Sequence, residues 1–342
     1  MSLNIPRVEL VLKPTPLYKM VNLSTDLGVN LYIKRDDLSL LSFGGNKLRK
    51  LEYTLADAIN KGCDTIVTTG SLTSNHAMLT AMAAKKLGLN VVLVLRSREP
   101  QFSRKVKGNL LIEHLLKARV EVFDVGKEDV NIAMKEVVES LKREGKKPYV
   151  LPLGGASPLG LLGYYDFVYE VLEQSKNMKI DFDYIVFATG SGGTQAGILL
   201  GVKKLKLKTR VIGVSDGTLA KYLKEKIYTL ANTSSKKYNI GVKVDYNDII
   251  VDERASFGGY GKFTRELIET ISYVVKREGI LLDPLYTGKA MYALIDMINK
   301  GEVKGNILFV HTGGLGGFFQ LEDQVKSIGD LPDEVEVKRL AI

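Results

Sequence analysis

Cysteine, tryptophan and histidine are scarce in this 342-residue sequence, which has one, none and three of them, respectively. The single cysteine, Cys63, excludes a disulfide or a cysteine metal cluster within one chain. With only three histidines, His76, His114 and His311, metal ligation has little support. No apolar run reaches the roughly 18 residues of a membrane-spanning helix, and no basic-then-apolar signal opens the sequence. We therefore expect a cytoplasmic protein without a membrane partner.

The charge balance is basic, because 48 lysines and arginines against 39 aspartates and glutamates leave a formal net charge of +9. Part of the excess lies in residues 203–210, where lysines are interleaved with leucines. Nucleic-acid binding is one interpretation, but no zinc-ligand spacing or aromatic-studded basic motif accompanies this segment, so we expect no nucleic-acid partner. An anionic ligand explains part of a positive balance equally well.

Apolar strand segments alternate with helix segments, which predicts an α/β protein with parallel sheets covered by helices on both faces. The expected strands are residues 31–34, 64–70, 90–95, 120–125, 149–153, 184–188, 211–214 and 306–310. The expected helices include residues 77–87, 129–144, 158–174, 263–277 and 287–299. At this length we expect two domains. We place a smaller α/β domain at residues 52–165, inserted between the two parts, residues 1–51 and 166–342, of a larger one. Most glycine turns follow predicted strands, so they should converge on one ligand-binding crevice.

Residues 43–52 read Phe-Gly-Gly-Asn-Lys-Leu-Arg-Lys-Leu-Glu and begin a predicted helix behind two glycines. Asn46 is a good helix N-cap, which places Lys47 in the first turn. The positive end of a helix disfavours a cation, so the pKa of Lys47 should be lowered. A lysine with a lowered pKa behind a glycine turn suits Schiff-base chemistry. The alternative is a solvated first turn whose lysines reach into water.

Residues 188–197 read Ala-Thr-Gly-Ser-Gly-Gly-Thr-Gln-Ala-Gly and join a buried strand directly to a helix. Backbone N–H groups, the hydroxyls of Ser191 and Thr194 and the helix dipole would form an anion cradle, most naturally for a phosphate. A dinucleotide fingerprint is the rival interpretation, with Asp216 as a ribose ligand, but Gln195 stands where the third glycine should be. A glycine-rich turn used only for tight packing is the remaining alternative.

Further polar turns precede predicted helices. The hydroxyls, amide and N-terminal N–H groups of residues 71–76 could bind a carboxylate, although plain N-capping needs only one such residue. Tyr260 is flanked by glycines, and Tyr286 and Thr287 lie on another turn into a helix. For either tyrosine alone, packing is the simpler explanation.

Five motifs follow one another in the chain: Gly-Gly-Asn-Lys-x-Arg-Lys-Leu-Glu, Ser-Asn-His after a strand, Thr-Gly-Ser-Gly-Gly-Thr, Asp-Pro-x-Tyr-Thr-Gly-Lys and His-Thr-Gly-Gly. Together they resemble the family of 1-aminocyclopropane-1-carboxylate (ACC) deaminases and D-cysteine desulfhydrases. These are tryptophan-synthase-β-like (fold-type II) enzymes that depend on pyridoxal 5'-phosphate (PLP). The resemblance runs from Pro14 to Gly314. It implies two open, twisted parallel-sheet domains with a cofactor cleft between them, a small amino-acid substrate and a homodimer.

By this resemblance, Lys47 matches the lysine that forms a Schiff base with PLP, and Asn75 matches the residue beside the phenolic oxygen of the cofactor. Ser74, Asn75 and His76 match the segment that holds the substrate carboxylate. The phosphate loop matches Thr189, Gly190, Ser191, Gly192, Gly193 and Thr194.

Tyr260 and Tyr286 match tyrosines near the reacting atoms, and we expect catalytic roles for both of them and for Ser74. Thr287 falls where a side chain meets the pyridine nitrogen, and Thr312 precedes the Gly-Gly of the last motif and would contact the substrate. The resemblance places glutamate and leucine at these two positions in ACC deaminases, whereas paired threonines are the desulfhydrase-like pattern.

The pattern therefore predicts a D-cysteine desulfhydrase-like lyase that converts D-cysteine to pyruvate, ammonia and sulfide. An ACC deaminase, which converts ACC to 2-oxobutanoate and ammonia, is the first alternative. A nicotinamide-dependent oxidoreductase, based on Gly190-x-Gly192 and Asp216, is an alternative of a different class. A non-catalytic basic binding protein is the third.

Overall fold

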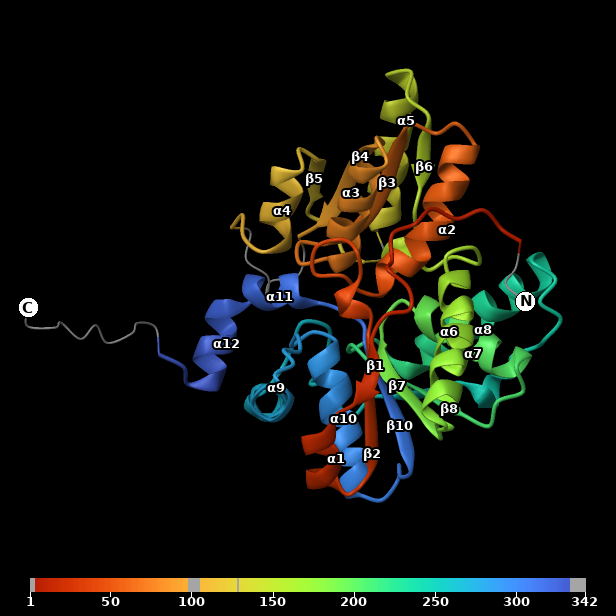
Figure 1. Ribbon diagram of the computed structural model, residues 1–342. Coiled ribbons are helices and arrows are strands. Elements are labelled where there is room, and N and C mark those ends of the chain that lie inside the picture. Colours follow the sequence, from red (N-terminus) through yellow and green to blue (C-terminus); the bar gives the residue numbers. More distant parts are fainter. Residues whose placement is uncertain (1–3, 98–104, 128, 333–342) are drawn as a thin grey trace, which may run out of the picture.

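The computed structural model describes residues 4–97, 105–127 and 129–332, which form two sheets with helices on both faces (Figure 1). Within these residues, the larger sheet has the strand order β1-β2-β10-β7-β8-β9. Its strands are β1 (Leu17–Lys19), β2 (Asn30–Arg35), β7 (Tyr184–Thr189), β8 (Arg210–Ser215), β9 (Ile250–Asp252) and β10 (Asn306–His311). All neighbours run parallel except β1 and β2, which pair antiparallel. The sequence predicts neither β1 nor β9, because three residues are too few to show a strand period.

The smaller sheet has the order β5-β4-β3-β6, and all its described strand pairs are parallel. Its strands are β3 (Thr65–Ser71), β4 (Asn90–Arg96), β5 (Arg119–Phe123) and β6 (Pro148–Val150). Every residue of β3 is buried, as expected for a central parallel strand covered on both faces.

Helices cover both faces of each sheet, which confirms the predicted architecture (Figure 1). One face of the larger sheet packs against α6 (Leu162–Met178), α7 (Gly193–Lys204) and α8 (Ala220–Lys237). The other face packs against α1 (Val21–Leu27), α9 (Arg265–Glu278), α10 (Thr287–Asn299) and α12 (Glu322–Gly329). The smaller sheet lies between α5 (Val130–Arg143) on one face and, on the other, α2 (Asn46–Asn60), α3 (Asn75–Lys86) and α4 (Asn109–Leu115). The short helix α11 (Leu315–Gln320) contacts α4.

The strands of the smaller sheet all come from residues 65–150, whereas those of the larger sheet come from both sides of this segment. Residue 51 lies within α2 and residue 165 within α6, so the chain passes between the two sheets inside helices. The domain boundaries at 51/52 and 165/166 stay a prediction. No helix in the described part of the chain is long and apolar enough to span a membrane.

A buried ionic cluster fastens α2 to the larger sheet. The Arg49 guanidinium, 1% exposed, donates to both carboxylate oxygens of Asp36, at 2.8 Å each. It also donates to both oxygens of Glu170 on α6, at 2.8 and 3.0 Å. Tyr164 donates a further hydrogen bond to Asp36, and Lys34 donates one to Glu170. These neighbours satisfy the charge of Arg49, which rules out a solvated first turn at this position of α2.

Substitution of Arg49 by methionine should lower the free energy of unfolding by about 3–5 kcal/mol, because it leaves two buried carboxylates without their main partner. Urea denaturation of the cofactor-free protein measures this change. The control is Lys61→Met, which breaks an exposed ion pair with Asp57 and should change stability by no more than about 0.5 kcal/mol. Equal losses in the two variants would contradict the role given to Arg49.

Candidate active site

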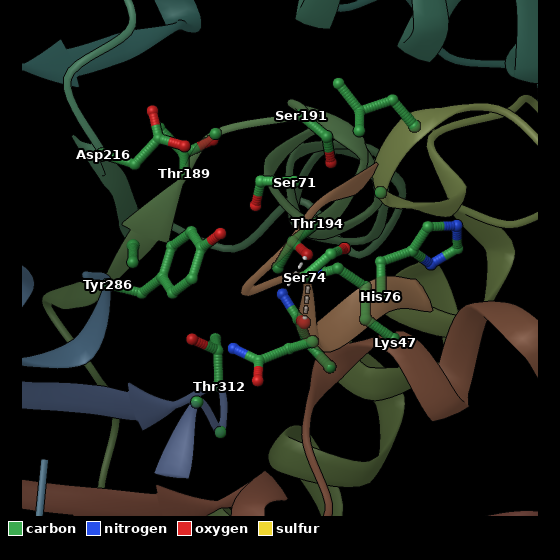
Figure 2. A pocket seen from close by; sticks show the side chains of 18 of the residues that line it. Lys47, Ser71, Ser74, His76, Thr189, Ser191, Thr194, Asp216, Tyr286 and Thr312 are labelled. Atoms are coloured by element: carbon green, nitrogen blue, oxygen red, sulfur yellow. Dashed lines mark hydrogen bonds between the residues drawn. The ribbon is translucent and has the colours of Figure 1, made fainter. Parts of the chain in front are cut away.

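A cavity lies where the carboxyl ends of β3, β7, β8 and β10 meet, between the two sheets (Figure 2). The glycine turns after these strands thus converge on one crevice, as expected. Lys47, Ser74, Asn75, His76, Thr189, Gly190, Ser191, Gly192, Thr194, Tyr260, Tyr286 and Thr312 line it. Gly193 and Thr287 are the predicted site residues that do not. Figure 2 shows Asp216 next to Thr189, and it shows Tyr286 and Thr312 across the cavity from His76.

Lys47 lies in the first turn of α2, but Gly45 and not Asn46 is the N-cap, which corrects the predicted helix start by one residue. The Asn46 side chain instead donates to Thr194 Oγ1 at 3.0 Å and accepts a hydrogen bond from Lys47 Nζ at 2.6 Å. The Asn46 N–H donates to the Thr312 carbonyl at 3.0 Å, which ties the start of α2 to the turn after β10. A Cβ on Gly45 would lie 2.9 Å from the same carbonyl oxygen, so this close approach requires glycine.

Burial lowers the pKa of Lys47 to about 8, and the nearby carboxylates of Asp216 and Asp283 partly oppose the shift. The shift has the predicted direction, and burial of the amine is its largest cause. An amine with this pKa is partly neutral near pH 7, which suits both a nucleophile and a proton acceptor.

The loop from β7 to α7 has the form of an anion cradle. Gly192 caps α7 with φ +81°, and a Cβ there would lie 2.9 Å from Ile227 Cγ1. The Thr189 hydroxyl is buried and has no hydrogen-bond partner among the described residues. The N–H groups of the first turn of α7 have no intrahelical acceptors and are available to an anion.

Lys50 places a buried amine beside this loop. Its side chain is 1% exposed, and Nζ makes one hydrogen bond in the described structure, a 3.3 Å contact to the Gly154 carbonyl. A Cβ on Gly193 would lie 3.3 Å from the same nitrogen. Burial and the positive charges of Lys47 and Lys226 hold the pKa of Lys50 well below its usual value. A buried amine without a carboxylate partner next to an amide cradle fits a phosphate dianion. The sequence analysis does not identify Lys50, for which the only signal is its i+3 spacing from Lys47.

The start of α3 offers a site for a carboxylate. Ser74 is the N-cap, and its Oγ accepts the Ala77 N–H at 3.1 Å. The His76 ring lies 2.9 Å from Thr68 Oγ1 and 3.4 Å from Thr80 Oγ1, so both ring nitrogens have partners away from the cavity. Burial and the charges of Lys47 and Lys50 keep the pKa of His76 well below its usual value, so its ring is neutral. A substrate carboxylate at this helix start would therefore bind the backbone N–H groups and the Ser74 hydroxyl, and not the imidazole.

Two tyrosine hydroxyls meet in the cavity. Tyr260 and Tyr286 lie 2.7 Å apart, oxygen to oxygen, and Ser71 Oγ lies 3.3 Å from the Tyr260 hydroxyl. Burial raises the pKa of both tyrosines, and that of Tyr286 well above its usual value. Both phenols are therefore protonated at neutral pH and can donate a proton or a hydrogen bond. Ser71 is a polar neighbour that the sequence analysis does not assign to Tyr260, because the two are 189 residues apart.

Thr287 is fully buried and is not among the residues that line the cavity, and its contact with the pyridine nitrogen stays a prediction. Its Oγ1 donates to Asp283 Oδ1 at 2.7 Å and accepts the Asp283 N–H at 2.9 Å. Asp283 Oδ2 in turn accepts the N–H groups of Leu285 and Tyr286, each at 2.9 Å. The Asp283–Thr287 pair thus holds the turn that presents Tyr286. Thr312, by contrast, lines the cavity directly.

The structure does not support a dinucleotide-binding loop, because Gln195 occupies the position of the third glycine of that fingerprint. Gln195 points beneath the loop, where its amide donates to the Ile250 carbonyl at 2.7 Å. Asp216 lies against the loop, since a Cβ on Gly190 would be 2.1 Å from its Oδ2. Among the residues that the structure describes, no group of three or more His, Cys, Asp or Glu side chains could hold a metal ion.

Comparisons with known proteins agree with this geometry. A family model described as pyridoxal-phosphate dependent enzyme matches residues 8–313. A Pyrococcus horikoshii protein named as a candidate ACC deaminase is 46% identical over 326 residues, which cover 94% of this chain and 96% of that protein. The D-cysteine desulfhydrase of Yersinia enterocolitica is 39% identical over 324 residues, which cover 94% of this chain and 97% of that protein. A crystal structure of an ACC deaminase homologue matches with a TM-score of 0.89 at 44% identity, covering 95% of this chain and 97% of that one.

Substitution of Lys50 by methionine should weaken PLP retention about ten- to a hundredfold, because a charge-assisted hydrogen bond to the phosphate is lost. The cofactor-free protein should become no less stable, because the same change removes a buried amine that has no carboxylate partner. Absorbance after dialysis measures retention, and thermal unfolding measures the stability of the cofactor-free protein. The control, Lys61→Met at the other end of α2, should alter neither. Unchanged PLP retention in Lys50→Met would refute the phosphate contact.

Proposed function

Because the chain belongs to the family of pyridoxal-phosphate-dependent enzymes that contains ACC deaminases and D-cysteine desulfhydrases, we propose that it eliminates sulfide from D-cysteine. Water then hydrolyses the eliminated enamine, so that the products are pyruvate, ammonia and sulfide. The observation that carries this proposal is Thr312, a polar side chain in the cavity wall at the position where leucine is expected for an ACC deaminase. Family membership leaves no support for a nicotinamide-dependent oxidoreductase or a non-catalytic basic binding protein.

PLP supplies the electron sink that stabilises negative charge at the α-carbon of a bound amino acid. In our proposal, Lys47 holds the cofactor and then, as a free amine with a pKa of about 8, removes the α-proton. The Ser74 hydroxyl and the backbone N–H groups at the start of α3 bind the substrate carboxylate. The protonated pair Tyr260 and Tyr286 would give a proton to the departing thiolate.

The choice between the two substrates depends on what each reaction demands. D-cysteine has an α-proton and a good leaving group, so one base and one acid suffice for elimination. ACC has no α-proton, and opening its ring relies more on a deep electron sink. At position 287 this chain has a neutral hydroxyl bonded to Asp283 and not a carboxylate directed at the cofactor, which favours the less demanding elimination.

ACC deamination remains the second candidate, because the relative with 46% identity carries that name and the desulfhydrase with 39% identity is more distant. The proposed homodimer and cytoplasmic location rest on the resemblance and on the sequence composition, respectively.

Lys47 should carry the cofactor. Borohydride reduction of the yellow holoenzyme, followed by peptide mapping, should place the pyridoxyl group on Lys47, because its amine is the one with a lowered pKa that lines the cavity. Lys47→Ala should abolish turnover while the anion cradle still binds PLP reversibly. A label on Lys50 or on any other lysine would end this assignment.

The native enzyme should prefer D-cysteine to ACC when pyruvate and 2-oxobutanoate formation are measured in parallel. Thr312→Leu should lower kcat/KM for D-cysteine about tenfold or more, because an apolar side chain replaces a polar part of the wall. Thr54→Val removes a hydroxyl from α2 outside the cavity and should leave the ratio of the two substrates unchanged. A native preference for ACC would overturn the assignment to D-cysteine.

A further inference from the structure

Lys289 is a fully buried lysine that the mechanism above does not use. It lies on α10, three residues after Tyr286, and its ammonium group donates to three backbone carbonyls. These are the carbonyls of Asp216 at 3.0 Å, Ser256 at 3.3 Å and Gly259 at 3.3 Å. The three acceptors belong to two separate segments, the turn after β8 and the loop of residues 256–261, which we call the Tyr260 loop. Lys289 therefore joins both segments to the helix that follows Tyr286.

The Tyr260 loop has a backbone that requires such support. Phe257 has φ +48°, a left-handed conformation that is strained for a bulky residue, and Gly258 and Gly259 have φ +82° and +141°. The Phe257 ring packs edge-on against Tyr292 at 5.3 Å, and Lys289 Nζ lies 5.6 Å from its centre. A strained segment keeps one conformation only where surrounding contacts impose it.

The two segments that Lys289 joins also touch each other next to the cavity. A Cβ on Gly217 would lie 2.3 Å from the Gly259 carbonyl carbon and 2.4 Å from the Tyr260 nitrogen. The backbone of Tyr260 is thus pressed against the turn that carries Asp216, and both residues line the cavity. A displacement of the Tyr260 loop would therefore break the 2.7 Å contact between the Tyr260 and Tyr286 hydroxyls.

We propose that Lys289 is a positioning residue: by bonding three carbonyls it holds the Tyr260 loop against the turn after β8 and so aligns the Tyr260 hydroxyl with Tyr286. The residue does not line the cavity and acts only through Tyr260. Burial lowers the pKa of Lys289 to about 8, while the charges of Asp216 and Asp283 favour its protonated form. The Lys289 side chain is therefore charged below pH 7. Its hold on the three carbonyls weakens as the pH rises through about 8, because a neutral amine has fewer N–H donors than an ammonium group.

The first test is hydrogen–deuterium exchange of the holoenzyme, which needs no substrate. Lys289→Met should speed exchange about tenfold or more in peptides that cover the Tyr260 loop, because the charge-assisted bonds that fix it are lost. The control is Lys204→Met. It removes a lysine that also donates to a backbone carbonyl, that of Ile240 at 2.7 Å, but that does not line the cavity. It should leave exchange in the Tyr260 loop unchanged.

The second test is a double-mutant cycle with Tyr260→Phe, using whichever amino acid the enzyme turns over. In the native background Lys289→Met should lower kcat about tenfold or more with little change in KM. In the Tyr260→Phe background it should lower kcat less than about twofold, because the hydroxyl that it aligns is absent. Lys289→Arg, which keeps the charge and several donors, should recover part of the lost kcat. In the native enzyme, protection of the Tyr260 loop from exchange should fall as the pH rises through about 8, and in Lys289→Arg it should not, because arginine stays charged.

This inference rests on the proposed catalytic role of Tyr260, but its failure can be distinguished from failure of the proposed function. Lack of D-cysteine turnover would count against the substrate alone, since exchange is measured without substrate. Equal losses of kcat in both backgrounds, or unchanged exchange in the Tyr260 loop, would overturn the role of Lys289. If Lys289→Met does not fold, Lys289→Gln, which lacks both the charge and the reach, carries the same expectations.

Discussion

The position of helix α2 is the constraint on which the cavity depends, and the buried contacts of Arg49 impose it. Arg49 bonds Asp36 at the end of β2 and Glu170 on α6, so it connects α2 to the larger sheet and to the helix layer that covers it. A Cβ on Gly163 would lie 2.0 Å from the Arg49 carbonyl oxygen, which shows how closely α6 packs on α2. Rotation of α2 is thereby blocked. Lys47 then faces the cavity and Lys50 the loop from β7 to α7, within one turn of the same helix.

The buried ionisable groups of this protein fall into two classes, those whose charge is matched by polar partners and those without a carboxylate partner. Arg49 is matched by two carboxylates, and Lys289 is matched by three carbonyls. Asp283 accepts four hydrogen bonds, from three backbone N–H groups and the Thr287 hydroxyl. Lys47 and Lys50 have no carboxylate bound to them in the described structure, and burial opposes their charge. A buried amine without a carboxylate partner is costly to charge, so two of them at one place make it a candidate site for an anionic or electrophilic partner.

Much of the fold and the cavity could be predicted from the sequence, because strand and helix periods are local and the carboxyl ends of parallel strands share one edge. The predicted helix at residues 287–299 coincides with α10. The antiparallel β1 could not be predicted, since three residues carry no period. The place of Lys50 in the site and the contact of Ser71 with Tyr260 could not be predicted for a related reason, because they involve residues 104 and 189 positions away in the chain. The expected contact of Thr287 with the pyridine nitrogen comes from the resemblance alone, and the sequence does not show that its hydroxyl donates to the Asp283 carboxylate.

At Thr312, in the turn after β10, the backbone and the side chain have separate roles. The Thr312 carbonyl accepts the Asn46 N–H and so supports the start of α2, while the rest of the residue contributes to the cavity wall. Every amino acid offers the same carbonyl, so the support of Lys47 is independent of which side chain stands at position 312. If Thr312 contacts the substrate as proposed, natural selection can exchange that side chain and alter which amino acids are accepted, without loosening the helix that carries Lys47. The substrate range could then evolve independently of the support for the proposed catalytic base.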